Sequence, residues 1–461
     1  MKRLNHNLLL LKINKFSILI YFSIFFSLSS CSFDHKTGIW KGSDDEKRKI
    51  SEIEKNQKQT LSVDKIHTSD ADYVKEVSLA QKIVLSAPQK NKSWKMSELN
   101  YQNSIGNVYL ANVDNIFLKK KIGKNKFYIS KLMSSPLIYK DNIIFSDDRG
   151  TLFNINQRGK INWKKNIYSK IFKKIYKNLT FTIYKCKVYI SDNIGFIYAL
   201  NLDDGELIWV KNHGIPLKSK IKVFDDKIFL INQDNRLISL NVKDGSKVWD
   251  IRTISSFIKT QNFLSLAISE EGHVVALNSS GDLLKAKAKN GTVLWSLNAL
   301  RSSFAHATDF FTSSGVVIHD DDVFFSAGKS ILSVSLKNGT INWQQEANSV
   351  ATPIVDEKNI FAVTDNGFFL ILDRDTGNII SSSNILKSLK KKKQLTKITG
   401  FIMGSGKIYS VTSNGYLIVS SAISGRAEYS RKIGDTITSS PVINEGKLYI
   451  LTEDSRIIGF N

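Results

Sequence analysis

The chain has 461 residues, of which 42% are hydrophobic and 10% aromatic, and only 5 are proline. This composition is that of a globular protein and excludes a disordered chain, although the length alone allows about three domains. Lys and Arg number 65 against 42 Asp and Glu, so the chain is strongly basic.

The first 30 residues have the layout of an export signal. A basic stretch precedes the apolar run Phe16–Leu28, which is too short to span a bilayer comfortably. The next residues, Leu28-Ser29-Ser30-Cys31, resemble the lipobox of bacterial lipoproteins, in which cleavage leaves the cysteine as a lipidated N-terminus. We therefore predict a signal peptide over residues 1–30 and lipidation at Cys31. The alternatives are a plain signal peptide with a cysteine there by chance, or an uncleaved anchor.

Residues 31–92 are polar and charged, and we predict a flexible tether for them. Ser32, rather than an aspartate, follows the cysteine, which favours the outer membrane over retention at the inner membrane. Because an exported protein does not normally meet nucleic acid, the basic excess indicates a lysine-rich surface, part of which faces anionic lipid. With Cys31 lipidated, Cys186 is the remaining thiol, so no disulfide can form within the chain. Cys186 lies in the strand-like stretch TIYKCKVYI, and we expect it in the core.

From Trp94 onward, a sequence unit recurs about every 38–48 residues, which is the period of a propeller blade. In Ser191–Trp209, a period-2 pattern predicts a strand, and Asp204-Gly205 predicts a tight hairpin turn with positive φ. The turn glycine recurs as Gly159, Gly205, Gly245, Gly291, Gly339, Gly377 and Gly425. Four residues later stand Trp163, Trp209, Trp249, Trp295, Trp343, Ser381 and Tyr429.

Two further strands precede each hairpin turn, which makes four antiparallel strands per unit. The second strand is expected at Asn142–Phe145, Lys187–Ile190, Lys227–Ile231, Val274–Leu277, Asp322–Phe325, Ile360–Val363, Lys407–Val411 and Lys447–Leu451. A glycine or asparagine usually follows it in the turn to the third strand. Lys329 and Ser455 depart from this rule, and Gly328 is expected to take the role of Lys329. The pattern predicts an all-β fold, an eight-bladed β-propeller of four-stranded antiparallel blades.

The eighth unit lacks its fourth strand, because the sequence stops at Asn461 before the eighth hairpin turn. Asn115–Ile122 lies one period ahead of Trp163, and we predict that it completes the last blade and so leaves no open edge. The alternative is seven blades with one degenerate unit. The predicted domains are thus a signal peptide over 1–30, a tether over 31–92 and a propeller over 93–461.

The unit ends in Asp-Gly followed, four residues after the glycine, by Trp, and over about residues 94–461 it resembles the PQQ-like, or quinoprotein-type, propeller repeat. With its lipobox, tether and eight blades, the chain is similar to the BamB family of outer-membrane assembly lipoproteins. The resemblance implies a non-enzymatic scaffold without a cofactor, lipid-anchored at the periplasmic face of the outer membrane. Its implied partners are a BamA-like barrel-assembly subunit and other members of the assembly complex, in which it is a monomer; nucleic acid is not a partner.

Quinoprotein dehydrogenases share this propeller, and their resemblance implies PQQ, Ca²⁺ and a catalytic aspartate beside a vicinal disulfide. This chain has no adjacent cysteines, and its paired carboxylates fall in expected turns, at Asp203-Asp204, Asp225-Asp226 and Asp320-Asp321-Asp322. Its 7 histidines show no metal-ligand spacing. We therefore expect no catalytic, cofactor or metal residues. A periplasmic quinoprotein-like dehydrogenase or a ligand-binding propeller is the alternative function.

Two expected inter-blade loops carry apolar residues where polar ones are usual: ISSFIK at 254–259 and ATDFFT at 307–312. The BamB resemblance implies that such loops bind the barrel-assembly subunit, and alignment assigns this role to Phe257, Ile258, Lys259 and Asp309. A lysine at 259 stands where the family has arginine, which removes a bidentate donor. The alternative is that these residues anchor the loops in the core. The basic run at 386–397 is either a solvated loop or a contact for anionic headgroups or an acidic partner.

Overall fold

The computed structural model describes strands Ser32–Asp34 and Ile39–Lys41 and residues 73–79, 81–125, 133–169, 172, 175–253, 264–300, 312–349, 351–364, 366–389 and 396–461. The chain divides into two compact units, Met1–Asp70 and Ala71–Asn461. In the first unit, β1 (Ser32–Asp34) and β2 (Ile39–Lys41) pair as antiparallel strands. Among the described residues, no helix has the length and apolar character needed to cross a membrane.

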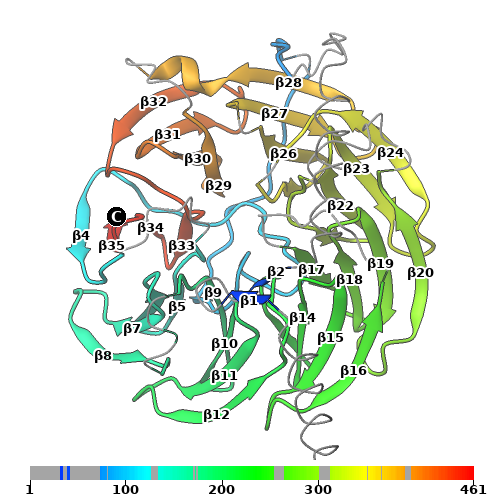
Figure 1. The fold of residues 1–461 in the computed structure, drawn as a ribbon. Coiled ribbons are helices and arrows are strands. Elements are labelled where there is room, and N and C mark those ends of the chain that lie inside the picture. The colour runs from blue at the N-terminus through cyan, green and yellow to red at the C-terminus, as the bar shows by residue number, and fades with distance from the viewer. Residues whose placement is uncertain are drawn as a thin grey trace, which may run out of the picture. The chain divides into compact units, whose positions relative to one another are not determined.

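The second unit is a ring of blades, and in blades one to seven the strands follow chain order from the axis outward (Figure 1). Blade one consists of β5 (Leu137–Tyr139), β6 (Asn142–Ser146), β7 (Thr151–Ile155) and β8 (Ile161–Asn166), with β3 (Ser93–Trp94) at its inner edge. Blade two consists of β9 (Leu179–Tyr184), β10 (Lys187–Asp192), β11 (Phe196–Asn201) and β12 (Leu207–Asn212). Blade three consists of β13 (Lys222–Phe224), β14 (Lys227–Ile231), β15 (Arg236–Asn241) and β16 (Lys247–Arg252).

The next three blades continue around the ring. Blade four consists of β17 (Ser265–Ile268), β18 (His273–Leu277), β19 (Asp282–Lys287) and β20 (Val293–Asn298). Blade five consists of β21 (Val317–His319), β22 (Asp322–Ala327), β23 (Ser330–Ser335) and β24 (Ile341–Glu346). Blade six consists of β25 (Ile354–Asp356), β26 (Asn359–Val363), β27 (Phe368–Asp373) and β28 (Ile379–Asn384).

A 3₁₀ turn, η2 (Ile385–Ser388), leads from blade six toward blade seven. Blade seven consists of β29 (Ile398–Gly404), β30 (Lys407–Thr412), β31 (Tyr416–Ser421) and β32 (Ala427–Lys432). Blade eight consists of β33 (Val442–Asn444), β34 (Lys447–Leu451), β35 (Arg456–Phe460) and β4 (Ile116–Lys121). The fold is therefore the predicted eight-bladed propeller, and the second strands lie where the repeat predicted them.

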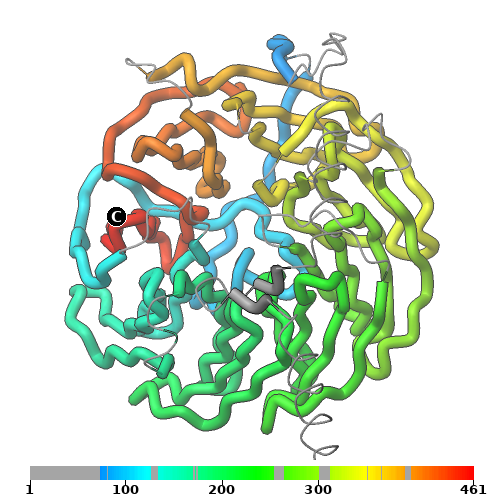
Figure 2. The backbone as a smooth tube through the Cα atoms, in the orientation of Figure 1, coloured from blue at the N-terminus to red at the C-terminus, as the bar shows by residue number. Residues whose placement is uncertain are grey.

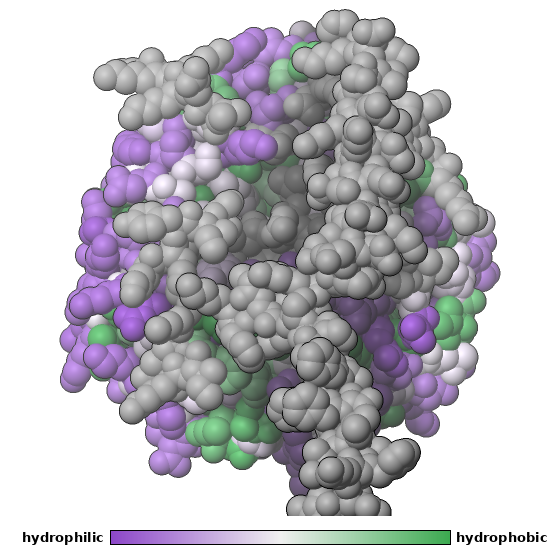
Figure 3. Space-filling model, viewed as in Figure 1, coloured by the Kyte–Doolittle hydropathy of each residue, from purple (hydrophilic) through white to green (hydrophobic). Residues whose placement is uncertain are grey.

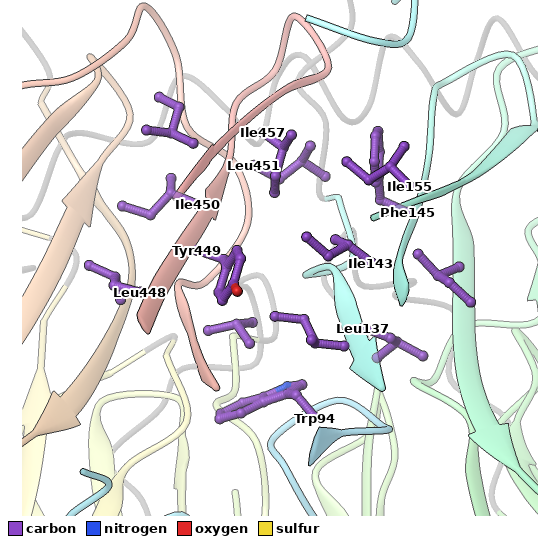
Figure 4. Close-up of a cluster of buried hydrophobic side chains, with 14 of the residues drawn as sticks. Trp94, Leu137, Ile143, Phe145, Ile155, Leu448, Tyr449, Ile450, Leu451 and Ile457 are labelled. Carbon is purple, nitrogen blue, oxygen red and sulfur yellow. The ribbon is translucent and has the colours of Figure 1, made fainter. Parts of the chain in front are cut away.

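The N-terminal strand closes the ring, as the count of strands predicted. β4 pairs antiparallel with β35, with Lys119 opposite Ile458 and Leu118 opposite Gly459. The seven-blade alternative is therefore wrong. Figure 4 shows the junction between the last blade and the first, where Tyr449 and Leu137 point toward one another above the ring of Trp94. Segments from opposite ends of the sequence are thus joined through one buried apolar cluster.

The five repeated tryptophans join blades one to five to the blade that follows each of them. Each indole nitrogen donates to a backbone carbonyl in the turn before the following blade's outer strand, at 2.8–3.1 Å: Trp163 to Leu202, Trp209 to Val242, Trp249 to Ala288, Trp295 to Leu336 and Trp343 to Arg374. The turn glycine of the following blade lies under the ring, where a Cβ would overlap it. The repeat therefore encodes contacts between blades as well as the hairpins within them.

Two details of the turns test the sequence analysis. Gly328 has a φ of 59°, so it does take the role expected at Lys329. The expectation of a core thiol was wrong, because Cys186 is exposed. Lys185 and Cys186 form a two-residue turn with φ of 45° and 55°, and Tyr184 pairs directly with Lys187. What the sequence presented as one strand is a hairpin of two.

Residues 73–112 run across the propeller before β4 begins. In Figure 2 the blue tube passes from the outer edge near β28 to the centre of the ring. Residues 73–79 and 81–92 belong to the segment for which the sequence predicts a tether, and they contact the propeller at several points, for example through Ser86, whose backbone N–H donates to Asp356 at 2.9 Å.

Polar side chains cover much of the coloured surface in Figure 3, with apolar patches along its margin. The outer strands account for exposed apolar side chains in the ring: Leu207, Ile208 and Val210 on β12, Val248 on β16, and Val293 and Leu294 on β20 are each 42–47% exposed.

Candidate functional site

The predicted partner-binding residues lie outside the described residues. Phe257, Ile258 and Lys259 fall in 254–263, and Asp309 falls in 301–311. Cys31, the predicted lipidation site, is also outside. The residues that flank the two loops are described, and they define where each loop leaves and rejoins the ring.

Hydrogen bonds fix the described ends of both loops. At the start of the first, Thr253 Oγ1 donates to the carbonyl of Asn235 at 2.6 Å and accepts from Asn278 Nδ2 at 2.9 Å. At its end, Leu264 N donates to the carbonyl of Lys218 at 3.0 Å. At the end of the second, the carbonyl of Thr312 accepts from Gly328 N at 2.9 Å. Both loops therefore join the scaffold at well-defined points.

The two loops emerge on the same face of the ring. Strand direction alternates within each blade, so the connections between blades and the turns between second and third strands share one face, which we call the loop face. The turns between first and second strands, and between third and fourth, form the opposite face, which we call the turn face. The first loop joins β16 to β17 and the second joins β20 to β21, so they are neighbours on the loop face.

A cavity of about 540 Å³ lies at the centre of the ring. Its lining on the loop-face side includes Leu264 and Thr312, which are the C-terminal ends of the two loops, together with Ser413 and Glu453 from turns between second and third strands. The sites where both candidate loops join the scaffold therefore border one central cavity, whose volume is in the range of small-molecule sites.

Residues 94–105 form the side of this cavity that lies toward the turn face. They bind the inner strands through main-chain hydrogen bonds from Ile183 N to Lys95 O at 2.7 Å, from Ile268 N to Tyr101 O at 2.8 Å and from Ile318 N to Gln102 O at 2.9 Å. Asn103 Nδ2 donates to the carbonyls of Leu266 and Val316 at 3.0 and 2.6 Å. One segment thus ties the inner strands of blades two, four and five together.

A buried charge cluster fastens the same segment to blade three. Lys220 pairs with Glu98, whose side chain is 10% exposed. Burial alone would raise the pKa of Glu98, but the ammonium of Lys220, together with Lys222 and a hydrogen bond from Thr352, leaves that pKa below its ordinary value. Lys222 is 1% exposed and donates to the carbonyls of Ser97 and Asn100 at 2.5 and 2.7 Å. Burial lowers the pKa of Lys222 to about 7, although Glu98 opposes the shift.

Four residues that line the cavity each bury a polar atom that finds no hydrogen-bond partner within the described protein: Trp94 Nε1, Ser97 Oγ, Asn103 Oδ1 and Thr438 Oγ1. Trp94 and Asn103 are each 2% exposed. Each of these four atoms has almost no accessible surface, so none of them is available to a guest in the cavity.

The cavity lining does not fit PQQ bound with Ca²⁺. A calcium ion needs several oxygen ligands, usually carboxylates, around one point. The carboxylate of Glu98 is already paired with Lys220. In the part of the chain that the structure describes, no group of three His, Cys, Asp or Glu side chains could hold a metal ion. The paired aspartates lie in surface turns, where Asp226 meets Lys185 at 2.7 Å and Asp320 meets Arg374 at 2.9 Å.

The sequence analysis missed the charge cluster at the cavity. A signal was present, because Lys218, Lys220 and Lys222 stand at every second position in and just before an inner strand, which places them on one face. The partner could not be found in this way. Glu98 lies in a segment whose sequence has no strand or helix periodicity. Its φ is 57°, and a glycine at this position would have indicated a turn, but a glutamate does not.

Comparisons with known proteins agree with the geometry. A family model described as "Outer membrane protein assembly factor BamB" matches residues 182–383 and 371–461. The outer membrane protein assembly factor BamB of Moranella endobia is 22% identical over 302 residues, which cover 60% of this chain and 72% of the relative.

Solved structures with the same fold include proteins of both functional classes that the sequence left open. BamB from Moraxella catarrhalis superposes with a TM-score of 0.60 at 12% identity, covering 75% of this chain and all of that structure. A europium-containing methanol dehydrogenase superposes with a TM-score of 0.61 at 9% identity, covering 80% of this chain and 89% of that structure. At such identities these likenesses establish the fold alone, whereas the family model matches more than half of the chain.

Proposed function

Because the chain belongs to the family of the outer membrane protein assembly factor BamB, we propose that it is a non-enzymatic scaffold of the outer-membrane β-barrel assembly machinery. In this proposal it docks on a BamA-like barrel-assembly subunit through the inter-blade loops that carry Phe257, Ile258, Lys259 and Asp309. It acts as a monomer within a complex that includes other assembly factors.

The observation that carries this proposal is the arrangement of the two loops. They leave neighbouring blades on the same face, and their described ends are held by hydrogen bonds to the scaffold. A rigid scaffold that presents two adjacent loops suits protein binding, since little order is lost on association. An apolar pair beside a lysine, with an aspartate one blade away, would supply an anchor and a charged rim.

The membrane address follows from the N-terminus. Lipidation at Cys31 would anchor the chain at the periplasmic face of the outer membrane, and the predicted tether, residues 31–92, would link the anchor to the propeller. A Cys31→Ser variant should leave the membrane fraction or keep its signal peptide. If it fractionates and migrates like the wild-type protein, the lipid anchor is excluded.

A ligand-binding propeller is the second candidate, and the central cavity of about 540 Å³ is the observation that favours it. A quinoprotein-like dehydrogenase has less support, because the cavity lining does not fit the metal that such chemistry uses.

Co-purification separates these functions. Full-length protein captured from detergent-solubilised membranes of the source organism should bring down the barrel-assembly subunit, identified by mass spectrometry. The same protein mixed with PQQ and Ca²⁺ should show no change in the absorbance spectrum of PQQ. Stoichiometric PQQ binding with alcohol-dependent dye reduction, and no assembly subunit in the eluate, would overturn the scaffold proposal.

A further inference from the structure

The segment 73–79 lies along the outer edge of blade six as an added strand. Val77 N donates to Ser382 O, and Ser382 N donates to Val77 O, both at 2.9 Å. Such a reciprocal pair is the hydrogen-bonding unit of an antiparallel ladder. The segment therefore extends the sheet of blade six beyond β28, and Figure 1 shows the blue chain beside this strand.

Side chains fix the register of the added strand. Ser382 Oγ donates to the carbonyl of Lys75 at 2.8 Å, and Lys387 Nζ, just beyond β28, donates to Glu76 Oε1 at 2.7 Å. Tyr73 packs edge-on against Phe368, with ring centroids 5.6 Å apart. The edge of blade six thus recognises an aromatic residue, an acidic residue three positions later and an extended backbone at the next position.

Blade six is the blade whose outer strand departs from the repeat. Ser381 stands in the position that tryptophan fills in blades one to five, and its hydroxyl faces the carbonyl of Val77 at 3.5 Å. Charged side chains on an edge strand discourage pairing with another strand. Six of the eight described outer strands carry charged side chains, whereas β20 and β28 carry none. Of these two strands, β20 has the tryptophan of the repeat and β28 does not. Its sequence, IISSSN, allows close approach of a backbone.

The added strand is held loosely. Val74 is 64% exposed and Leu79 is 41% exposed, and the two side chains of the Glu76–Lys387 pair are 49% and 61% exposed. An exposed ion pair contributes little, and ordering a seven-residue segment costs conformational entropy. These contacts favour docking that can be reversed without unfolding the blade.

We propose that the outer edge of blade six is a strand-acceptor site for an extended, acidic–apolar peptide segment of a partner protein. Residues 73–79 occupy the site in the resting chain, and a partner segment with an aromatic residue, then an acidic and an apolar one, takes their place. The site lies on the outer rim of the ring, so it is separate from the inter-blade loops and from the central cavity. It does not depend on the proposed docking of the assembly subunit.

The experiment uses the full-length chain and a fluorescein-labelled peptide with the sequence of residues 71–82. Val77→Pro removes the N–H that bonds to Ser382 and should release the chain's own segment. Fluorescence polarisation should then show the peptide binding this variant about tenfold or more tightly than wild type, because a tethered segment competes at an effective concentration near the millimolar range. Ser78→Pro is the matched control, since neighbouring N–H groups in a strand point to opposite sides, and it should bind like wild type.

Substitutions in the chain and in the peptide test the acceptor site. Lys387→Glu should weaken peptide binding to the Val77→Pro chain, and a peptide with Glu76→Lys should restore it. Ser381→Trp should abolish peptide binding, because the indole of the introduced tryptophan would fill the space beside Val77. Equal binding to wild type and Val77→Pro, no binding to either, or equal binding of a scrambled peptide would overturn the proposal. Dimerisation of the Val77→Pro chain that excludes the peptide would also overturn it, since the occupant would then be a second copy.

Discussion

Trp343 in blade five donates its indole N–H to the carbonyl of Arg374 in blade six, at 2.8 Å. The same ring covers Gly377, three residues beyond that carbonyl, where any Cβ would overlap it. One side chain therefore makes both a polar and an apolar contact with the next blade, and the repeat places an equivalent contact at four other boundaries.

Substitutions at Trp343 separate the two contacts. Trp343→Phe should cost about 1 kcal/mol of unfolding free energy, because it removes one hydrogen bond and keeps most of the apolar surface. Trp343→Ala should cost about 3–5 kcal/mol, because it also leaves a cavity at the boundary between blades. Denaturant unfolding measures both values. Equal losses of unfolding free energy in the two variants would show that packing of the Trp343 indole contributes nothing to stability.

Substitutions at glycine separate backbone strain from overlap with the ring. Gly377 and Gly214 have nearly equal φ, 75° and 74°, but a Cβ at Gly214 would meet no atom within 4 Å. Gly214→Ala should therefore cost about 1 kcal/mol, the strain of a positive φ, whereas Gly377→Ala should cost about 1–3 kcal/mol more. Similar unfolding free energies for the two variants would contradict a role for Gly377 in seating Trp343.

Closure of the ring by β4 predicts a difference between two truncations. Removal of residues 1–70 takes away only the first unit and should leave unfolding of the propeller cooperative. Removal of residues 1–122 also takes away β4 and the segment 73–112 that crosses the ring, exposes the edge of β35 and opens the buried cluster around Leu118. Calorimetry should then show a broad transition or none. A sharp transition at the original temperature would mean that β4 is not needed for closure.

The buried lysine predicts a dependence of stability on pH. The pKa of Lys222 is about 7 in the folded protein, against an ordinary value of 10.5 for the unfolded chain, so between these values the unfolded chain holds more protons. Stability must therefore rise with pH across this window. Relative to Lys222→Met, the wild-type unfolding free energy should increase from pH 7 to pH 9 by up to about 1.4 kcal/mol per unit. The exposed Lys243→Met controls for loss of a positive charge, and a flat difference between wild type and Lys222→Met would refute the shifted pKa.

The sequence predicted the ring because its information is local and repeated. Gly205 and Trp209 lie in one hairpin and also contact neighbouring blades. Because the same pattern recurs, one unit predicts the strands of the others. The count of strands then predicted the position of β4. Cys186 was misplaced because a Lys-Cys turn has no glycine or asparagine to announce its positive φ. Propensity is a weak guide where tertiary contacts hold such a turn.

The course of the N-terminal segment could not be predicted at all. Its route depends on single contacts, such as Glu98 with Lys220 and Val77 with Ser382, that join positions far apart in the chain. Neither contact recurs, so no period reveals it. The absence of tryptophan at position 381 was visible in the sequence, but the contact of Ser381 with the carbonyl of Val77, far upstream, was not.

The most direct test of the scaffold account is the affinity of the full-length chain for the purified periplasmic region of its barrel-assembly subunit. Ile258→Glu combined with Lys259→Glu should weaken binding by about 3 kcal/mol, roughly a hundredfold, with little change in unfolding temperature. The matched control is Ile423→Glu with Arg426→Glu, an exposed apolar–basic pair in a β31–β32 turn on the turn face, and it should bind like wild type. Binding retained by the loop variant, or lost equally by both variants, would contradict docking through the loop face.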